Sequence, residues 1–107
     1  MVTFDEFKKL DIRIGTVKSV EKVENTDKLL KLVFDLGTEE RQVLSGIAEF
    51  FPNFAELVGK QIAVLVNIEP RTIRGFESHG MLLAIGEGDN FTLLSPEKPV
   101  VAGSIVR

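Results

Sequence analysis

The sequence of 107 residues contains no cysteine. This absence excludes a disulfide framework, a thiolate metal site and a cysteine nucleophile, and it fits a reducing compartment. Long apolar runs are also missing, since no stretch approaches the roughly 20 residues that a membrane-spanning helix needs. The opening MVTFDEFKKL is acidic early and has no apolar core, so it does not resemble a secretory signal. We expect a cytoplasmic protein that contacts no membrane.

Histidine occurs only once, as His79, in a loop rich in glycine and serine. Its neighbours Glu77 and Ser78 do not form a catalytic triad with it, because the members of a triad come from separate elements. One histidine and scattered carboxylates are too few for a metal site. The glycine-rich residues 86–89 include two acids that would repel phosphate, so we interpret them as a tight turn. We expect no catalytic residue, no metal ion and no cofactor.

Positive charge is not in excess either. Thirteen Lys and Arg residues stand against sixteen Asp and Glu residues, which gives a net charge of −3. This balance argues against a protein that binds any polyanion, but it leaves room for one local basic face. Hydrophobic residues make up 44% of the chain, enough for one globular domain over residues 1–107.

Short segments with alternating apolar residues dominate the pattern. Thr3 and Glu6 have the spacing of a capping box, which predicts a short opening helix. Apolar positions alternate from Leu10, slip by one after Gly15 and resume at Val17. A glycine at such a slip is typical of a β-bulge, so we predict a long, bent first strand.

Further strands are expected at residues 30–36, 41–46, 61–67, 81–85 and 91–94. Residues 48–58 do not alternate and suit a short helical plug, whereas residues 69–80 predict one long polar connection. This arrangement favours an all-β fold, a five-stranded OB barrel with a short helix between strands three and four and with terminal extensions. The fourth strand is apolar on both faces, so its outer face needs a cover, either the terminal segments or a second subunit.

The connection before the fifth strand is locally basic. Residues 70–76 hold Arg71 and Arg74 and no acid. In an OB barrel the loop between strands four and five borders the nucleic-acid groove, and arginine binds phosphate in a fork or stacks on bases. Side chains that can stack on bases or bond to sugars and base edges lie nearby, namely Asn67, Phe76, Ser78 and His79. Lys28, Lys31 and Arg41 extend the same face. A solvated loop with two ordinary arginines is the alternative.

The segment VNIEPR at residues 66–71, Gly75 and the segment SHGMLLA at residues 78–84 resemble the signature of the tRNA-binding OB domains. Residues 7–17 resemble the first strand of this family, and the similarity extends over essentially the whole chain. The family includes free dimeric tRNA-binding proteins and the C-terminal domain of many methionyl-tRNA synthetases. It also includes the CsaA chaperones and the tRNA-binding region of endothelial monocyte-activating polypeptide II.

The resemblance implies a barrel that binds tRNA by its shape, and a homodimer formed by the terminal segments. Matching positions make Asn67, Arg71, Ser78 and Met81 candidates for the tRNA face, followed by Lys31 and Arg41. Arg74 and His79 are added by the local argument. Because the chain is more acidic than many members, we expect modest affinity that falls steeply with salt.

The leading hypothesis is therefore a non-catalytic module that binds tRNA and dimerises a methionyl-tRNA synthetase, whose catalytic part is its partner. A free-standing dimeric tRNA-binding protein is a close variant. The alternative from another class is a CsaA-like chaperone that holds unfolded polypeptides in an apolar groove, although the basic loop is less suited to that role.

Overall fold

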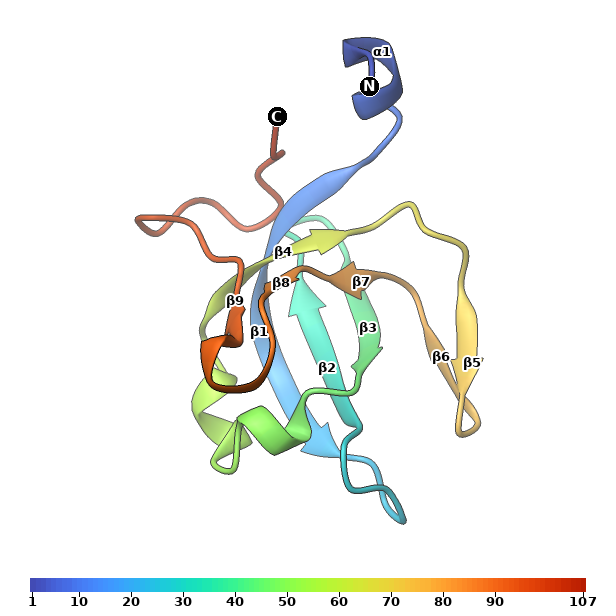
Figure 1. Cartoon of the computed structure of the whole chain (residues 1–107), viewed down its shortest axis with the longest axis vertical. Coiled ribbons are helices and arrows are strands. Elements are labelled where there is room, and N and C mark those ends of the chain that lie inside the picture. The colour runs from blue at the N-terminus through green and yellow to red at the C-terminus, as the bar shows by residue number, and fades with distance from the viewer.

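The computed structural model describes all residues, Met1–Arg107, and its centre is a five-stranded antiparallel barrel (Figure 1). In the order β3–β2–β1–β4–β7, the strands are β3 (Glu40–Ser45), β2 (Leu30–Asp35), β1 (Ile12–Lys22), β4 (Gln61–Leu65) and β7 (Met81–Leu82). The first half of β1 pairs with β4 and its second half pairs with β2, so one long strand joins both sides of the barrel. The expected OB-type barrel is confirmed.

The barrel closes between β3 and the residues that precede β7. The backbone N–H of His79 donates to the carbonyl oxygen of Gln42 at 2.8 Å, which links the two ends of the five-stranded sheet. A closed sheet has no long free edge on which another chain could pair. The loop before β7 is thus fixed to β3 as well as to its own strand.

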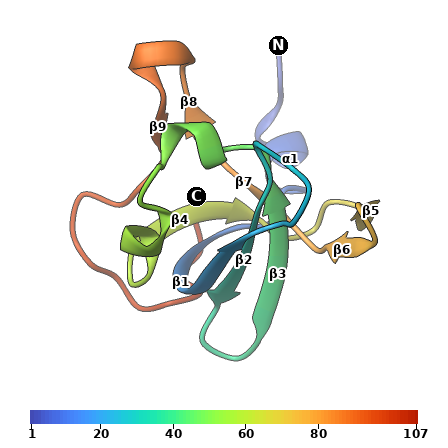
Figure 2. The same cartoon turned by 90° about the horizontal axis from the view of Figure 1, so that it is seen from below.

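Short helices and two small ribbons surround the barrel. The helical segments are α1 (Phe4–Phe7), η1 (Ala48–Phe50), η2 (Phe54–Leu57) and η3 (Gly88–Asn90). One ribbon pairs β5 (Arg71–Ile73) with β6 (Phe76–Ser78), and the other pairs β8 (Ala84–Ile85) with β9 (Thr92–Leu93). Figure 2 shows the β5–β6 ribbon standing off one side of the barrel as an arm. None of the helices has the length and apolar character needed to cross a membrane.

Alternate side chains of the strands fill the barrel. Leu30, Leu32 and Phe34 of β2 are all 0% exposed, as the period of two in this strand predicts. They pack in one cluster with buried residues of the other strands, including Val17, Val43, Ile62, Val64 and Leu82. The helical turns η1 and η2 add Ala48 and Leu57, so the predicted plug between strands three and four is confirmed as two 3₁₀ turns.

The capping box of the opening helix is confirmed, whereas the predicted position of the bulge is wrong. Thr3 Oγ1 accepts a hydrogen bond from the backbone of Glu6, and the Glu6 carboxylate accepts one from the backbone of Thr3. The register of β1 against β2 shifts between Val17 and Ser19 rather than at the glycine. Gly15 has a different role, because a Cβ atom there would lie 2.9 Å from Cδ1 of Phe34.

The long polar connection predicted at residues 69–80 contains two short strands that were not predicted, and these form the β5–β6 arm. Arg74 and Gly75 form its turn, with φ angles of 54° and 85°. Two successive positive φ angles define the type I′ turn, whose twist matches that of a two-stranded ribbon. The turn carries Arg74 to the tip of the arm.

The C-terminal tail runs along the first half of β1. Gly103 N–H donates to Ile14 O at 2.7 Å, Ile14 N–H donates to Ser104 O at 2.9 Å, and Val106 N–H donates to Ile12 O at 2.8 Å. The tail therefore acts as an additional strand beside β1, and the predicted terminal extension is part of the fold. Both chain ends lie at the same end of the molecule (Figure 1).

Candidate nucleic-acid interface

The guanidinium group of Arg41, on β3, forms hydrogen bonds with other parts of the fold. Its Nη1 donates to the carbonyl oxygens of Val66 at 2.7 Å and His79 at 3.2 Å, and its Nε donates to the Glu39 carboxylate at 3.1 Å. The side chain is 29% exposed. Arg41 thus connects β3 to both ends of the segment that carries the arm.

Asn67, just after β4, holds the N-terminal segment with both atoms of its amide. Its Oδ1 accepts from the backbone N–H of Asp11 at 2.8 Å, and its Nδ2 donates to the carbonyl oxygen of Lys9 at 2.7 Å. These two bonds use one acceptor and one donor position of the exposed amide, so one of each remains for a sugar or a base edge. Asn67 therefore supports the N-terminal segment, and its contact with tRNA stays a prediction.

Ser78, at the end of the arm, is the one buried polar residue of the chain and is 3% exposed. Its hydroxyl accepts from the backbone N–H of Leu44 at 3.0 Å and donates to the carbonyl oxygen of Gly80 at 3.2 Å. A buried hydroxyl with both functions occupied shapes the loop. Arg41, Asn67 and Ser78 therefore lie together around the base of the arm and fix its position.

Arg71 and Arg74 differ from these three residues, because both are exposed and neither forms an ion pair. Arg71 lies at the base of the arm, where it lines a small hollow of about 100 Å³ together with Ser78 and Met81. The side chain of Met81 is 44% exposed there. An unpaired guanidinium keeps all its donors available for a phosphate oxygen.

The side chains of Lys31 and His79 are partly exposed, and each already pairs with a glutamate. The ammonium group of Lys31 pairs with Glu21 and lies 4.6 Å from the centre of the Phe76 ring, an arrangement that holds the arm against β2. Nε2 of His79 lies 2.9 Å from the carboxylate of Glu77. Both side chains lie next to the arm, and both already interact with other residues of the chain.

A cleft between the β1–β2 turn and the arm contains residues that the sequence prediction did not include. It has a volume of about 460 Å³, and its lining residues are Glu21, Lys22, Val23, Glu24, Asn25, Lys31, Arg74 and Phe76. The expected fold class could have indicated these cleft residues, because the loops after the first and fourth strands of an OB barrel face each other. The prediction used only the second of these loops.

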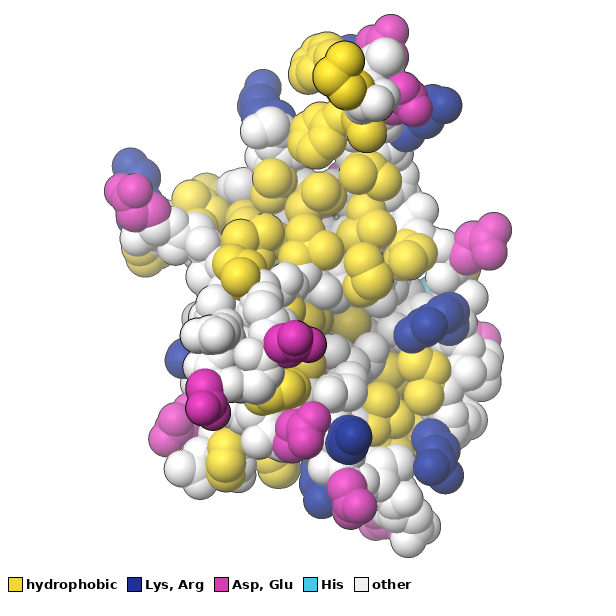
Figure 3. Space-filling model, viewed as in Figure 1, with side chains coloured by type: hydrophobic (Ala, Val, Ile, Leu, Met, Phe, Trp, Pro, Cys, Tyr) yellow, Lys and Arg dark blue, Asp and Glu magenta, His cyan; other side chains and the backbone are white.

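Charge is unevenly distributed over the surface. Lys18 pairs with Glu40, and this hydrogen bond raises the pKa of the Lys18 ammonium group above its ordinary value. Arg13 and Arg41 also have carboxylate partners. Figure 3 shows cationic side chains around a small apolar patch on the side of the arm, while acidic side chains gather on the opposite lower side. The arm side is therefore the local basic face expected within an acidic chain.

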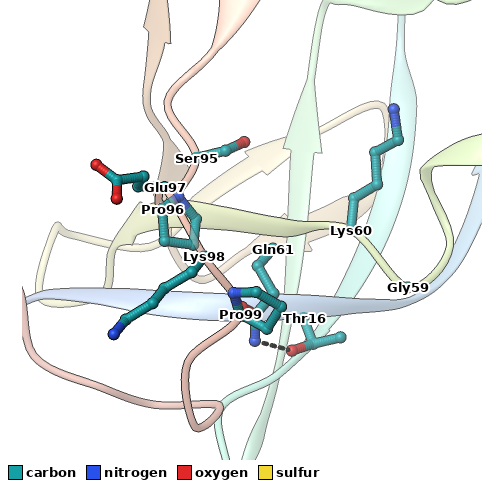
Figure 4. Close-up of a pocket in the computed structure, with 9 residues that line it drawn as sticks. All are labelled: Thr16, Gly59, Lys60, Gln61, Ser95, Pro96, Glu97, Lys98 and Pro99. Carbon is teal, nitrogen blue, oxygen red and sulfur yellow. Dashed lines mark hydrogen bonds between the residues drawn. The ribbon is translucent and has the colours of Figure 1, made fainter.

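A second cavity, of about 440 Å³, lies under the C-terminal tail. The Gln61 side chain exchanges two hydrogen bonds with the backbone of Val100 and donates a third to Thr16, which fastens the tail to β4 and β1. Figure 4 shows that Lys60 and Lys98 extend from this cavity in different directions. Their charges do not converge, so the cavity is a seam of the fold. No three His, Cys, Asp or Glu side chains gather closely enough to hold a metal ion.

The barrel, its helical plug and the basic arm beside the β1–β2 turn define an OB-type nucleic-acid-binding domain. The family model described as "Putative tRNA binding domain" matches residues 12–105. The chain belongs to this family of tRNA-binding domains.

Relatives in the family include methionyl-tRNA synthetases. The methionine--tRNA ligase of Methanothrix thermoacetophila is 47% identical over 107 residues, which are 100% of this chain and 16% of the ligase. The ligase of Thermotoga maritima is 48% identical over 105 residues, which are 98% of this chain and 16% of the ligase. The chain thus spans about one-sixth of the length of these enzymes.

Solved structures that match over the whole chain include a synthetase-related protein and a chaperone. A protein related to methionyl-tRNA synthetase from Pyrococcus horikoshii has a TM-score of 0.91 and 38% identity, and the match covers 100% of this chain and 98% of that chain. The chaperone CsaA from Bacillus anthracis has a TM-score of 0.87 and 30% identity, with coverage of 100% and 99%. The same barrel therefore occurs both in a protein described as related to methionyl-tRNA synthetase and in a protein described as a chaperone.

Proposed function

We propose that the chain is a non-catalytic module that binds tRNA and dimerises, and that it forms the C-terminal domain of a methionyl-tRNA synthetase. The observation that carries the binding proposal is the pair of exposed arginines, Arg71 and Arg74, on an arm anchored by Arg41 and Ser78. A fixed arm presents its phosphate-binding groups at constant spacing. It can therefore select the shape of a folded RNA, while phosphate contacts contribute no information about base sequence.

The proposed second copy covers an apolar face. Figure 3 shows this face over the region of β4, β7 and β8 in Figure 1. Exposed large apolar side chains of the terminal segments and of these ribbons include Phe4, Phe7, Leu10, Met81, Ile85, Leu94, Val101 and Ile105. Helix α1 has only four residues and buries none of them, so it lacks the packing that stabilises so short a helix. A symmetric contact between two such faces would bury both and order both helices.

In a synthetase the module would act through proximity. Attachment to a catalytic part makes the second binding event intramolecular, so the enzyme captures tRNA more effectively without any change at the aminoacylation site. The identity of 47% to the Methanothrix thermoacetophila ligase over one-sixth of that enzyme supports this placement. The cytoplasmic location expected from the sequence stays a prediction.

Competition with a synthetase tests the module. An excess of the chain should displace tRNA from a full-length methionyl-tRNA synthetase that carries this domain, and the Arg71→Ala/Arg74→Ala double variant should need a much higher concentration. A chain that leaves the synthetase–tRNA complex intact at saturating concentration would contradict the proposal.

The similarity to CsaA and the apolar face favour one second candidate, a chaperone that holds unfolded polypeptides. It predicts that the chain suppresses the aggregation of an unfolded test protein and binds tRNA weakly. Measuring both properties on the same preparation distinguishes the candidates, because the arginines of the arm contribute to RNA binding and an apolar groove contributes to peptide binding.

A further inference from the structure

The cleft between the β1–β2 turn and the arm has a composition that phosphate binding alone does not explain. Of its lining residues, Lys22 and Arg74 have no carboxylate partner, and Glu24 has no cationic partner. Glu21, in contrast, is paired with Lys31. A free carboxylate beside two free cations repels a phosphate placed against it. Glu24 therefore suits a part of the ligand that donates hydrogen bonds.

An aromatic surface lines the same cleft. Phe76 is 36% exposed as a residue, and the ammonium group of Lys31 lies 4.6 Å from the centre of its ring. Exposed aromatic side chains in the grooves of proteins that bind single strands stack on unpaired bases, and each stacked base contributes about 1–3 kcal/mol. The backbone that carries the ring is held in place, because β6 pairs with β5 and Ser78, two residues further on, is anchored to Leu44.

The size of the cleft fits a base and its neighbour. Its volume of about 460 Å³ lies within the range of small-molecule sites, roughly 300–1,000 Å³. A second hollow of about 390 Å³ adjoins it, because Asn25 and Arg74 line both. Arg74 thus stands between two hollows at the tip of the arm, where its left-handed backbone in the type I′ turn places it.

We propose that this cleft binds one unpaired RNA base that carries an exocyclic amino group, stacked on Phe76, with Glu24 accepting a hydrogen bond from the amino group. Lys22 and Arg74 bind the phosphates on either side of the base. A carboxylate only accepts hydrogen bonds, so it favours the amino groups of cytosine, adenine and guanine over the carbonyl oxygens of uracil. The domain then adds a base preference to recognition by shape.

This inference rests on the proposed binding of RNA and adds to it a specific contact. Phosphate contacts at Arg71 and along the arm require no unpaired base, whereas the cleft requires one. RNA binding without occupation of the cleft is therefore a distinct and observable result.

The chain contains no tryptophan, so a Phe76→Trp variant has a single indole, placed in the cleft, and retains a stacking surface. We expect its fluorescence to be quenched by single-stranded hexamers of cytidine or adenosine at several-fold lower concentration than by hexamers of uridine. A Val58→Trp variant, with its indole at an apolar position of 51% exposure after η2, is the control and should not be quenched. Adding Glu24→Gln to the Phe76→Trp variant should remove the preference between cytidine and uridine. Glu56→Gln, an exposed acid on η2, should leave the preference unchanged.

Transfer RNA binding is measured on the same preparations. Equal quenching by all hexamers, or a preference that persists with Glu24→Gln, would overturn the assignment of Glu24 as the acceptor for the amino group of the base. Salt-sensitive tRNA binding without quenching by any hexamer would overturn the cleft while leaving the proposed function intact. Absence of tRNA binding by the unmodified chain would instead overturn the proposed function.

Discussion

The guanidinium group of Arg41 donates a hydrogen bond to the carbonyl oxygen of Val66 at 2.7 Å. A second bond from the same nitrogen reaches His79, so one side chain joins the two ends of the arm segment to β3. We therefore expect Arg41→Met to lower the free energy of unfolding by about 1–3 kcal/mol, since two backbone carbonyls lose a charged donor. Urea denaturation measures this change.

Arg71→Met is the matched control, because Arg71 is exposed and has no carboxylate partner. Its effect on stability should stay within about 0.5 kcal/mol. The assignment of Arg41 to the fold would be wrong if Arg41→Met left stability unchanged and weakened tRNA binding as strongly as Arg71→Met does.

The side chain of Asn67 should hold the N-terminal segment in place at Lys9 and Asp11. Loss of its amide in Asn67→Ala removes the acceptor of the Asp11 N–H and the donor to the Lys9 carbonyl. We expect faster hydrogen exchange at the Asp11 amide and a loss of stability of about 1–2 kcal/mol. Asn53→Ala is the control, because the side chain of Asn53 caps no helix. Equal exchange rates at Asp11 in both variants would contradict the support role.

The barrel could be predicted from the sequence because the alternation of apolar residues within a strand is a local pattern. Leu30, Leu32 and Phe34 alternate in one strand, and the same residues are fully buried. The arm was missed because its strands have only three residues each, too few for a periodic pattern, and because Arg74 takes a left-handed conformation that is unusual for arginine.

The hydrogen-bond partners of the candidate site residues within the fold could not be read from the sequence. Asn67, Ser78 and Arg41 are polar residues near a basic loop, and whether they bind RNA or backbone depends on which groups the fold brings to them. Their partners Asp11, Leu44 and Val66 lie between 25 and 56 residues away along the chain. The exposed arginines Arg71 and Arg74 were predictable, because exposure is the usual state of arginine.

Gly15 should be required by the packing of Phe34 rather than by a bulge. A methyl group in Gly15→Ala would lie 2.9 Å from Cδ1 of the ring, so the core must shift at a cost of about 1–3 kcal/mol. Gly46→Ala is the control, since no heavy atom lies within 4 Å of its added Cβ. Thermal denaturation of both variants tests this prediction. Equal stabilities would show that β1 can bend away from Phe34 without cost.

A charge on the apolar face should disrupt the proposed dimer. Ile105 is 63% exposed in the tail beside β1, and Ile105→Asp would place an unpaired carboxylate in the contact. We expect the dissociation constant of the dimer to rise at least about 30-fold, the equivalent of about 2 kcal/mol. Sedimentation equilibrium measures it. Val58→Asp, at an apolar side chain of 51% exposure after η2, is the control. A monomeric unmodified chain at high concentration would contradict the dimer itself.

The most direct test of the central claim is tRNA binding by the chain across a series of salt concentrations, with Arg71→Ala and Lys98→Ala alongside. The account predicts that affinity falls steeply with salt and that Arg71→Ala reduces the slope of log K against log salt by about one. Lys98→Ala, on the tail side, should leave the slope unchanged. No tRNA binding at low salt, or equal slopes for all three proteins, would contradict the claim that the arm binds the phosphate backbone.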